Sequence, residues 1–259
     1  MTEYKHLTVT KEEHVALVTM CSTPVNTLTD GFMDELEHVF LALKEDAEIW
    51  AVVLCSSLKC FVSGADIKNL AICDRYGNIT LAERMQRVFL AVEDFPHPVI
   101  GAVGGIAFGG GLELALCCDL RVFDDTTRVA LPEAGLGIIP GAGGTQRLTK
   151  LVGPGAAKRI LYTGETIRAS DAYRLGLCEY TAEGNGCREK ALEVAKTICE
   201  KAPKAVSLDK ACVAYAQEHT LADGLDFERM HGSDLFATED QKEGANAFLE
   251  KRPAEFHNR

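Results

Sequence analysis

The sequence predicts an α/β fold whose C-terminal third is a layer of helices. Short apolar runs rich in β-branched residues, at 14–20, 49–55 and 99–103, have the composition of buried strands. Segments with apolar residues at helical spacing separate these runs. Beyond about residue 145 the strand-like runs become rare and helical patterns dominate. Because strands and helices alternate before that point, we expect an α/β core covered by helices.

The first predicted unit is a strand, a helix and a second strand. The strands are 14–20 (HVALVTM) and 49–55 (IWAVVLC), which are apolar and β-branched. Thr29 and Asp30 open the helix between them. Its apolar positions recur every three or four residues, at Phe32, Met33, Leu36, Val39, Phe40 and Leu43.

The second predicted unit repeats this order. A helical pattern covers 81–92, Pro96 and Pro98 interrupt it, and a short buried strand follows at 99–103. A buried helix at 112–118 and a strand at 120–123 come next. The later helical patterns cover 145–152, 155–163, 169–175, 187–202 and 204–217. The sequence has no internal repeat or low-complexity linker, so we treat it as one continuous unit. Within it, an approximate boundary separates a core, 1–195, from a C-terminal helical region, 196–259.

Composition and charge exclude several classes of protein. The chain has 259 residues, 47% hydrophobic and 25% charged, as in an ordinary globular protein. Its net charge of -11 argues against general nucleic-acid binding, which needs clustered Lys and Arg. No apolar stretch suits a membrane span and the first thirty residues show no signal-peptide pattern, so we expect a cytoplasmic protein. The ten cysteines are scattered through apolar segments, so we expect mostly small buried thiols, such as Cys55, Cys117, Cys118 and Cys212. Because they include no C-x-x-C pair, we expect no metal site.

The segment 103–113 (VGGIAFGGGLE) is the most informative part of the sequence. It has five glycines in eleven residues, after a predicted strand and before a predicted helix. Backbone N–H groups left uncovered at a helix N-terminus attract negative charge. A tight strand-to-helix turn explains the glycines equally well, whereas the dinucleotide and P-loop patterns are absent. The second small-residue turn, 63–66 (SGAD), could aim another amide at the same atom, which would form an oxyanion hole.

Two carboxylates accompany these turns. Glu113 lies in the first turn of the helix after the glycines, where a capping or dipole-stabilising role would also account for it. Glu133 follows Pro132 in a predicted loop, where a solvated surface charge is the alternative. Twenty residues apart, the two can meet only through the tertiary fold.

Three longer blocks resemble the enoyl-CoA hydratase/isomerase family, also called the crotonase superfamily. They are 61–68 (FVSGADIK), 104–113 (GGIAFGGGLE) and 132–148 (PEAGLGIIPGAGGTQRL), and the resemblance continues to 247–252 (AFLEKR). The resemblance implies a crotonase-like ββα spiral core in 1–195. It also implies that the helical region, 196–259, is used to form a homotrimer or homohexamer.

The resemblance also implies roles for particular residues. The amides of Ala65 and Gly110 would form the oxyanion hole, with Glu113 as the main base and Glu133 as the main acid. Coenzyme A, as part of the substrate, would contact Ser63, Ala65, Asp66, Ile67 and Lys68, and also Phe248 and Lys251 from a neighbouring subunit. For the lysines and Phe248, a solvated charge and a packed aromatic are the alternatives.

The presence of both glutamates favours one reaction within the family. That reaction is the reversible addition of water to a trans-2-enoyl-CoA, giving a 3-hydroxyacyl-CoA, with no metal or redox cofactor. An enoyl-CoA isomerase, which would need only Glu133, is the second hypothesis. A non-catalytic relative that binds acyl-CoA or RNA is the third.

The sequence departs from the family pattern in four places. Gly104 replaces the usual asparagine before Gly105, and Ser63 replaces an alanine. The early loop 22–28 lacks Asn-Arg-Pro, and the segment 70–88, which sets the acyl pocket in the family, is unfamiliar. The length and shape of the acyl group therefore stay open.

Overall fold

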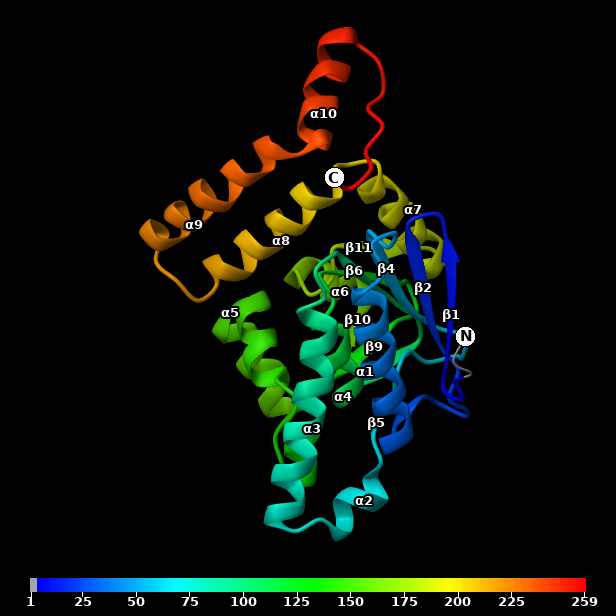
Figure 1. Ribbon diagram of the computed structural model, residues 1–259. Helices are drawn as coiled ribbons and strands as arrows, with labels where there is room; N and C mark the ends of the chain where they lie inside the picture. The colour runs from blue at the N-terminus through cyan, green and yellow to red at the C-terminus, as the bar shows by residue number, and fades with distance from the viewer. Residues whose placement is uncertain (1–3) are drawn as a thin grey trace.

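A computed structural model of the chain describes residues 4–259 (Figure 1). Its centre is a six-stranded sheet in the order β1-β2-β4-β6-β8-β11. β1 runs antiparallel to β2, and the remaining neighbours are parallel. These strands are β1 (Leu7–Glu12), β2 (Val15–Met20), β4 (Ala51–Ser56), β6 (Val99–Val103), β8 (Leu120–Asp124) and β11 (Tyr180–Ala182).

In the large sheet, β2, β4, β6 and β8 are each followed by a very short second strand. The short strands are β3 (Thr27–Leu28), β5 (Gly64–Ala65), β7 (Ile106–Phe108) and β9 (Arg128–Ala130). β3 pairs with β5, and β7 pairs with β9, which also pairs with β10 (Ile167–Arg168). A helix follows each pair of strands, so the chain repeats a ββα unit four times from β2 to α5. The predicted α/β fold with ββα units is confirmed.

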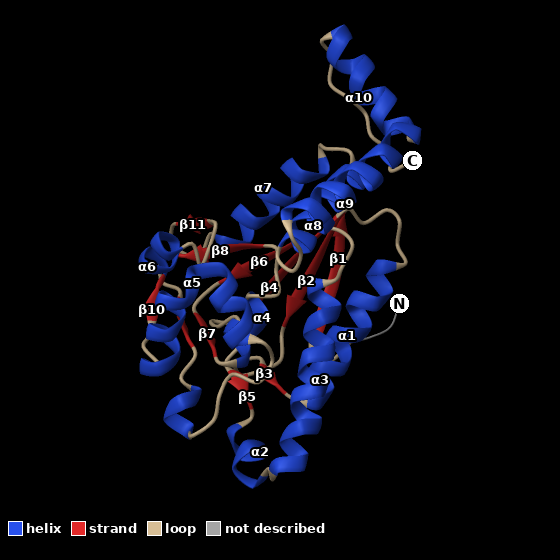
Figure 2. Cartoon of the chain, turned by 90° about the vertical axis from the view of Figure 1, so that its left-hand side faces the viewer, coloured by secondary structure: helices blue, strands red, loops and turns tan. Residues whose placement is uncertain are grey.

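The helices cover both faces of the large sheet. Their bounds are α1 (Asp30–Lys44), α2 (Ile67–Ile72), α3 (Arg75–Glu93), α4 (Gly110–Ala115), α5 (Gly144–Thr163), α6 (Ala169–Leu175), α7 (Cys187–Cys199), α8 (Pro203–Ala216), α9 (Leu221–Asp234) and α10 (Glu239–Glu250). Figure 2 shows α7 on one side of the sheet and α1 and α4 on the other. The alternation of side chains along β2 explains this arrangement: Val15 and Leu17 face α7, whereas Ala16 and Val18 join the larger core beneath α1 and α3.

Most predicted elements match, and the differences have physical reasons. The helix predicted at 81–92 begins at Arg75, because the Asp74 side chain caps it by accepting a bond from the Gly77 amide. The predicted gap between 145–152 and 155–163 is a kink at Gly153 inside α5. The helix predicted at 112–118 ends earlier, at Ala115. Cys212 is only half-buried, unlike Cys55, Cys117 and Cys118.

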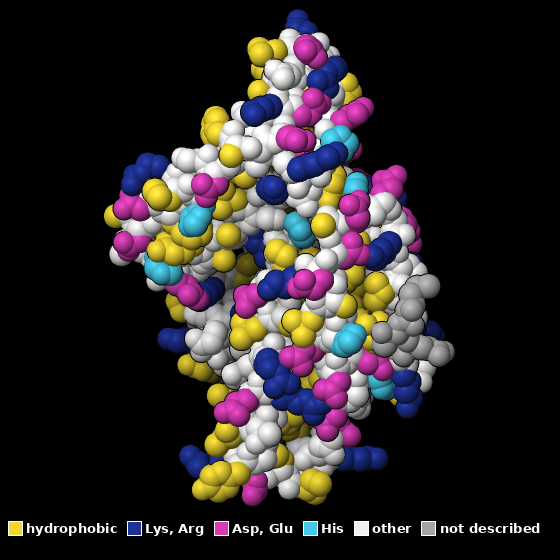
Figure 3. Space-filling view, in the orientation of Figure 1, with side chains coloured by type: hydrophobic (Ala, Val, Ile, Leu, Met, Phe, Trp, Pro, Cys, Tyr) yellow, Lys and Arg dark blue, Asp and Glu magenta, His cyan; other side chains and the backbone are white. Residues whose placement is uncertain are grey.

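The last helices project from the body of the protein (Figures 1 and 2). α8 and α9 pack against each other, and α10 extends beyond them. The predicted division at 195 and 196 falls inside α7, which still covers the sheet, so the projecting layer starts at Pro203. Apolar side chains are exposed on this layer (Figure 3), among them Leu221, Met230, Phe236, Phe248 and Leu249. Trimer formation through this layer stays a prediction.

Within residues 4–259, none of the helices has both the length and the apolar content needed to cross a membrane.

Candidate active site

The short second strands bring the predicted site residues to one cavity. Ala65 ends β5, Gly110 starts α4 two residues after β7, and Glu133 starts a short 3-10 helix after β9. The cavity has a volume of about 500 Å³. It is lined by Thr27, Ser63, Gly64, Ala65, Asp66, Ile67, Lys68, Leu70, Asn78, Leu81, Ala82, Met85, Phe108, Gly109, Gly110, Glu113, Pro132, Glu133, Leu136, Ile138, Ile139 and Gly141. A largely apolar hollow with a few convergent polar groups is typical of a small-molecule site.

The backbone is crowded where Ala65 and Gly110 approach each other, and glycines at 64 and 110 fit this crowding. A Cβ atom on Gly110 would lie 2.5 Å from Cδ1 of Leu28 and 3.9 Å from the amide nitrogen of Ala65. Gly64 has φ +107°, and a Cβ there would lie 2.9 Å from the carbonyl oxygen of Phe108. Gly110 is the first residue of α4, so its N–H has no acceptor within the helix. The two predicted amide donors therefore line the same part of the cavity.

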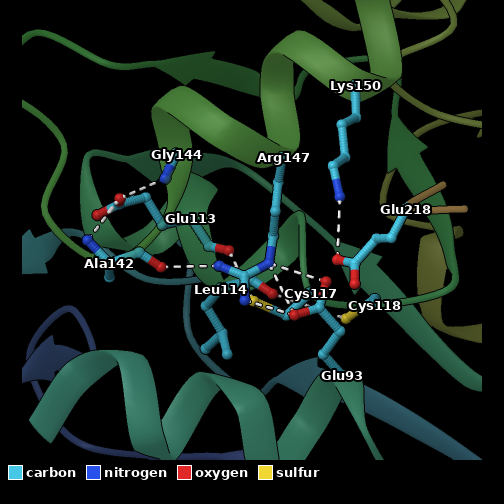
Figure 4. Close-up of polar contacts among 10 residues, drawn as sticks. All are labelled: Glu93, Glu113, Leu114, Cys117, Cys118, Ala142, Gly144, Arg147, Lys150 and Glu218. Atoms are coloured by element: carbon cyan, nitrogen blue, oxygen red, sulfur yellow. Dashed lines mark hydrogen bonds and ion pairs between the residues drawn. The ribbon is translucent and has the colours of Figure 1, made fainter. Parts of the chain in front are cut away.

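Glu113 is held by the backbone at the start of α5 (Figure 4). Its side chain is buried, and Oε1 accepts hydrogen bonds from the amides of Ala142 at 2.8 Å and Gly144 at 2.7 Å. Burial raises the pKa of this carboxyl, and the two amide bonds and the charge of Arg147 oppose that rise. A helix N-terminus also favours a negative charge. The surroundings thus suit a carboxylate that can be ionised.

Glu133 has a different environment. It is 8% exposed, and its Oε2 has no hydrogen-bond partner among the described residues. Burial raises its pKa to about 7, with a further contribution from the negative charge of Glu113. Gly109 has φ +54°, and a Cβ there would lie 2.9 Å from Oε1 of Glu133, so a side chain at this position would be strained and would displace the carboxyl. The alternative of a solvated loop charge for Glu133 is wrong, because the side chain is buried against the cavity.

The predicted coenzyme A contacts fall into two groups. Ser63, Asp66, Ile67 and Lys68 line the cavity with Ala65, and the Asp66 side chain caps α2 by accepting a bond from the Lys68 amide at 2.9 Å. Phe248 and Lys251 lie instead at the end of the projecting α10, where Phe248 is 84% exposed. Neither is among the described residues that line the cavity. Their role across a subunit interface stays a prediction.

Comparisons with known proteins agree on one family. The sequence pattern described as enoyl-CoA hydratase/isomerase matches residues 10–259. The chain is 38% identical to the short-chain-enoyl-CoA hydratase of Clostridium acetobutylicum, over 99% of this chain and all of that protein. It is 37% identical to the crotonyl-CoA hydratase of Syntrophomonas wolfei, over 98% of each chain.

The chain belongs to the enoyl-CoA hydratase/isomerase family. The fold agrees with this assignment. The crystal structure of an enoyl-CoA hydratase from Bacillus anthracis superposes with a TM-score of 0.95, at 34% identity, over 98% of this chain and all of that chain.

One departure from the family pattern has a visible structural consequence. A Cβ at Gly104 would lie 2.8 Å from Oδ2 of Asp124 and 3.4 Å from Sγ of Cys187. Asp124 is buried and accepts a 2.8 Å bond from the amide of Cys187, the first residue of α7. Gly104 also lines a second cavity of about 530 Å³ that shares no lining residue with the first. The missing asparagine therefore leaves room for Asp124 rather than altering the candidate active site.

Sequence reasoning gave no role to the residues that hold Glu113. Ala142 and Gly144 lie in the block 132–148, in which the sequence points to a role for Glu133 alone. A signal was available, since a carboxylate in a buried helix needs donors, and the N–H groups at the start of α5 have no acceptor within that helix. Their partnership with Glu113 nevertheless depends on the tertiary contact between α4 and α5.

Proposed function

We propose that this protein is an enoyl-CoA hydratase that reversibly adds water to a trans-2-enoyl-CoA. One observation carries the proposal: two buried carboxyls of unlike environment line the same cavity as two backbone amide donors. The family and the hydratase names of its full-length relatives support the same reaction. An isomerase would need only Glu133, so the isomerase hypothesis gives the buried Glu113 no catalytic role.

The amides of Ala65 and Gly110 are proposed to bind the thioester carbonyl oxygen. When oxygen adds to the β-carbon of a conjugated thioester, negative charge builds up on this carbonyl oxygen. Fixed N–H donors stabilise that charge more than they stabilise the neutral ground state. Because the donors are backbone groups held by β5 and the start of α4, they need little reorganisation as the charge forms.

The two glutamates are proposed to move the protons. Glu113 accepts a proton from water, and the resulting oxygen nucleophile bonds to the β-carbon. Glu133, which retains a proton near neutral pH, gives it to the α-carbon as the enolate collapses. The sum is one water added across the double bond, with no oxidation or reduction, and the proton on Glu113 returns to Glu133, directly or through solvent, before the next turnover. Since both carboxyls face one cavity, their titrations are coupled.

The substrate class is proposed to be an acyl-CoA thioester, with no metal or redox cofactor. Coenzyme A is strongly anionic, and the net charge of -11 makes a local cation important for binding it. Lys68 at the cavity is the proposed cation, and Lys251 and Phe248 would add contacts from a neighbouring subunit in a homotrimer or homohexamer. We also propose that the protein is located in the cytoplasm.

The direct test uses the purified protein and a panel of enoyl-CoA thioesters. Hydration removes the conjugated thioester absorbance and gives a 3-hydroxyacyl product that mass spectrometry identifies. We expect crotonyl-CoA or another 2-enoyl-CoA to be hydrated. A protein that only shifts a 3-enoyl double bond would support the isomerase hypothesis, and one that binds acyl-CoA without turnover would support the non-catalytic one. Comparing short, long, branched and cyclic acyl groups in the same assay defines the acyl preference.

A further inference from the structure

A half-buried arginine lies directly behind the loop that holds Glu113. Arg147, in the first turn of α5, donates from Nη1 to the carbonyl oxygen of Ala142 at 2.8 Å. Its Nε donates to Glu93, the last residue of α3, at 2.9 and 3.0 Å, and Nη2 adds a further contact with the same carboxylate. The Arg147 side chain is 15% exposed. Figure 4 shows the guanidinium between Glu93 and the Ala142 carbonyl.

The loop is built around this guanidinium. A Cβ on Gly143 would lie 2.1 Å from Nη1 of Arg147, so a side chain cannot occupy that position without displacing the arginine. Ala142 uses both of its backbone groups here: its carbonyl accepts from Arg147 and its N–H donates to Glu113. A second anchor from α3 supports the loop, since the Gln86 side chain donates to the Gly141 carbonyl at 2.8 Å.

We propose that Arg147 is a positioning residue for the hydratase reaction, which fixes loop 140–144 so that the amides of Ala142 and Gly144 hold Glu113 in place. The inference rests on the proposed function. It extends that function by adding a chain of contacts that leads from Glu93 through Arg147 to the base. A small displacement of a catalytic group can cost a large part of the rate, so the alignment of this loop matters for turnover.

The alternative is an ion pair that only ties α3 to α5. One feature separates the two roles. Arg147 is close enough to Glu113 for its positive charge to oppose the rise in the pKa of that carboxyl. The other titratable groups that face Glu113 are Glu133 and Cys117, which lies just after α4, while Glu93 lies behind Arg147. A positioning role therefore predicts a change in the pH profile that a simple structural tie does not.

The test compares Arg147→Gln with Arg147→Lys and with Arg87→Gln. Arg87 is a matched control, because it also joins α3 to a glutamate, Glu37 of α1, but is 62% exposed. For Arg147→Gln, we expect kcat to fall by about 10- to 100-fold with little change in KM. We expect the acid limb of kcat/KM to move to higher pH by about 0.5 to 1 unit. Arg147→Lys keeps the positive charge, so its acid limb should stay at the wild-type pH. Arg87→Gln should behave like the wild type in both kcat and pH profile.

Hydrogen–deuterium exchange gives a readout that does not depend on activity. We expect Arg147→Gln to raise deuterium uptake in segment 140–146 while strand β6 stays protected. If Arg147→Gln does not fold, Glu93→Gln takes its place, with a lower kcat and the same local rise in uptake. A normal acid limb in a folded Arg147→Gln protein, or uptake that rises everywhere equally, would overturn the inference. A wild-type protein that hydrates no enoyl-CoA would instead defeat the proposed function and leave the exchange data to decide this inference.

Discussion

Oε1 of Glu113 accepts a hydrogen bond of 2.7 Å from the N–H of Gly144, the first residue of α5. This contact joins the helix that follows the glycine-rich turn to a segment thirty-one residues further along the chain. Glu133, across the cavity, has an oxygen with no partner among the described residues. The two carboxyls therefore differ in what they can do: Glu113 is supported as an anion, and Glu133 holds a proton more readily.

Replacing Gly110 should damage the proposed oxyanion hole through crowding. In Gly110→Ala the new methyl group would lie 2.5 Å from Cδ1 of Leu28 and 3.2 Å from Cε of Met85, so either these side chains or the Gly110 backbone must shift. We expect kcat to fall by about 100- to 1,000-fold, the usual cost of losing one such donor. Steady-state hydration kinetics measure this. In Gly110→Ala with Leu28→Val, which lacks the Cδ atoms, part of the rate should return; equal rates in the single and double variants would refute the steric explanation.

The pH profile should reflect the proton on Glu133. Its pKa is raised to about 7 by burial, and hydration requires the protonated form. As pH rises through this value the proton is lost, so kcat/KM for hydration should decline above about pH 7. Stopped-flow rates over a series of buffers check this. If kcat/KM instead stayed constant up to about pH 9, this result would contradict the assignment of Glu133 as the acid.

The same carboxyl should make stability depend on pH. A carboxyl whose folded pKa is raised stabilises the native state fully below its ordinary pKa of 4.5, and that contribution is lost as pH rises through about 7. Glu133→Gln removes the buried charge, so it should stabilise the protein at pH 8 by about 2 to 3 kcal/mol relative to the wild type. Near pH 5 the difference should be small. Urea unfolding at both pH values measures it, and an equal effect at each would count against a raised pKa.

Restoring the asparagine of the family pattern should destabilise this chain. In Gly104→Asn the side chain would meet Oδ2 of the buried Asp124, and such overpacking costs about 1 to 3 kcal/mol. Gly155→Asn is a suitable control, because a Cβ at that position meets nothing within 4 Å. Urea unfolding should separate the two variants, whereas the kcat of folded Gly104→Asn should stay near that of the wild type. Equal stability would show that Asp124 can move aside.

The sequence allowed the long elements to be predicted but not the short ones. The strand runs at 49–55 and 99–103 and the helix after Thr29 are long enough for a periodic pattern, and all three are present. β3 and β5 have two residues each, too few for a pattern. These strands complete the ββα units, which explains why no internal repeat was visible in the sequence.

In the candidate active site, too, only the features with a local sequence pattern could be predicted. The glycine turns and Glu113 could be picked out, because uncovered amides at a helix N-terminus have a recognisable composition. The burial of Glu133 could not, since it depends on how the segment after β9 packs against the cavity. The role of Arg147 depends on contacts with Glu93 and Ala142, which lie on other elements. Residues joined by tertiary packing alone leave no local pattern.

The hydration of crotonyl-CoA by Glu113→Gln tests the central claim most directly. The variant keeps the shape of the side chain but cannot accept a proton from water. We expect its kcat to fall by about 100- to 10,000-fold relative to the wild type, while Glu45→Gln, at the exposed end of α1, keeps the wild-type rate. Undiminished hydration by a correctly folded Glu113→Gln protein would contradict the assignment of Glu113 as the base.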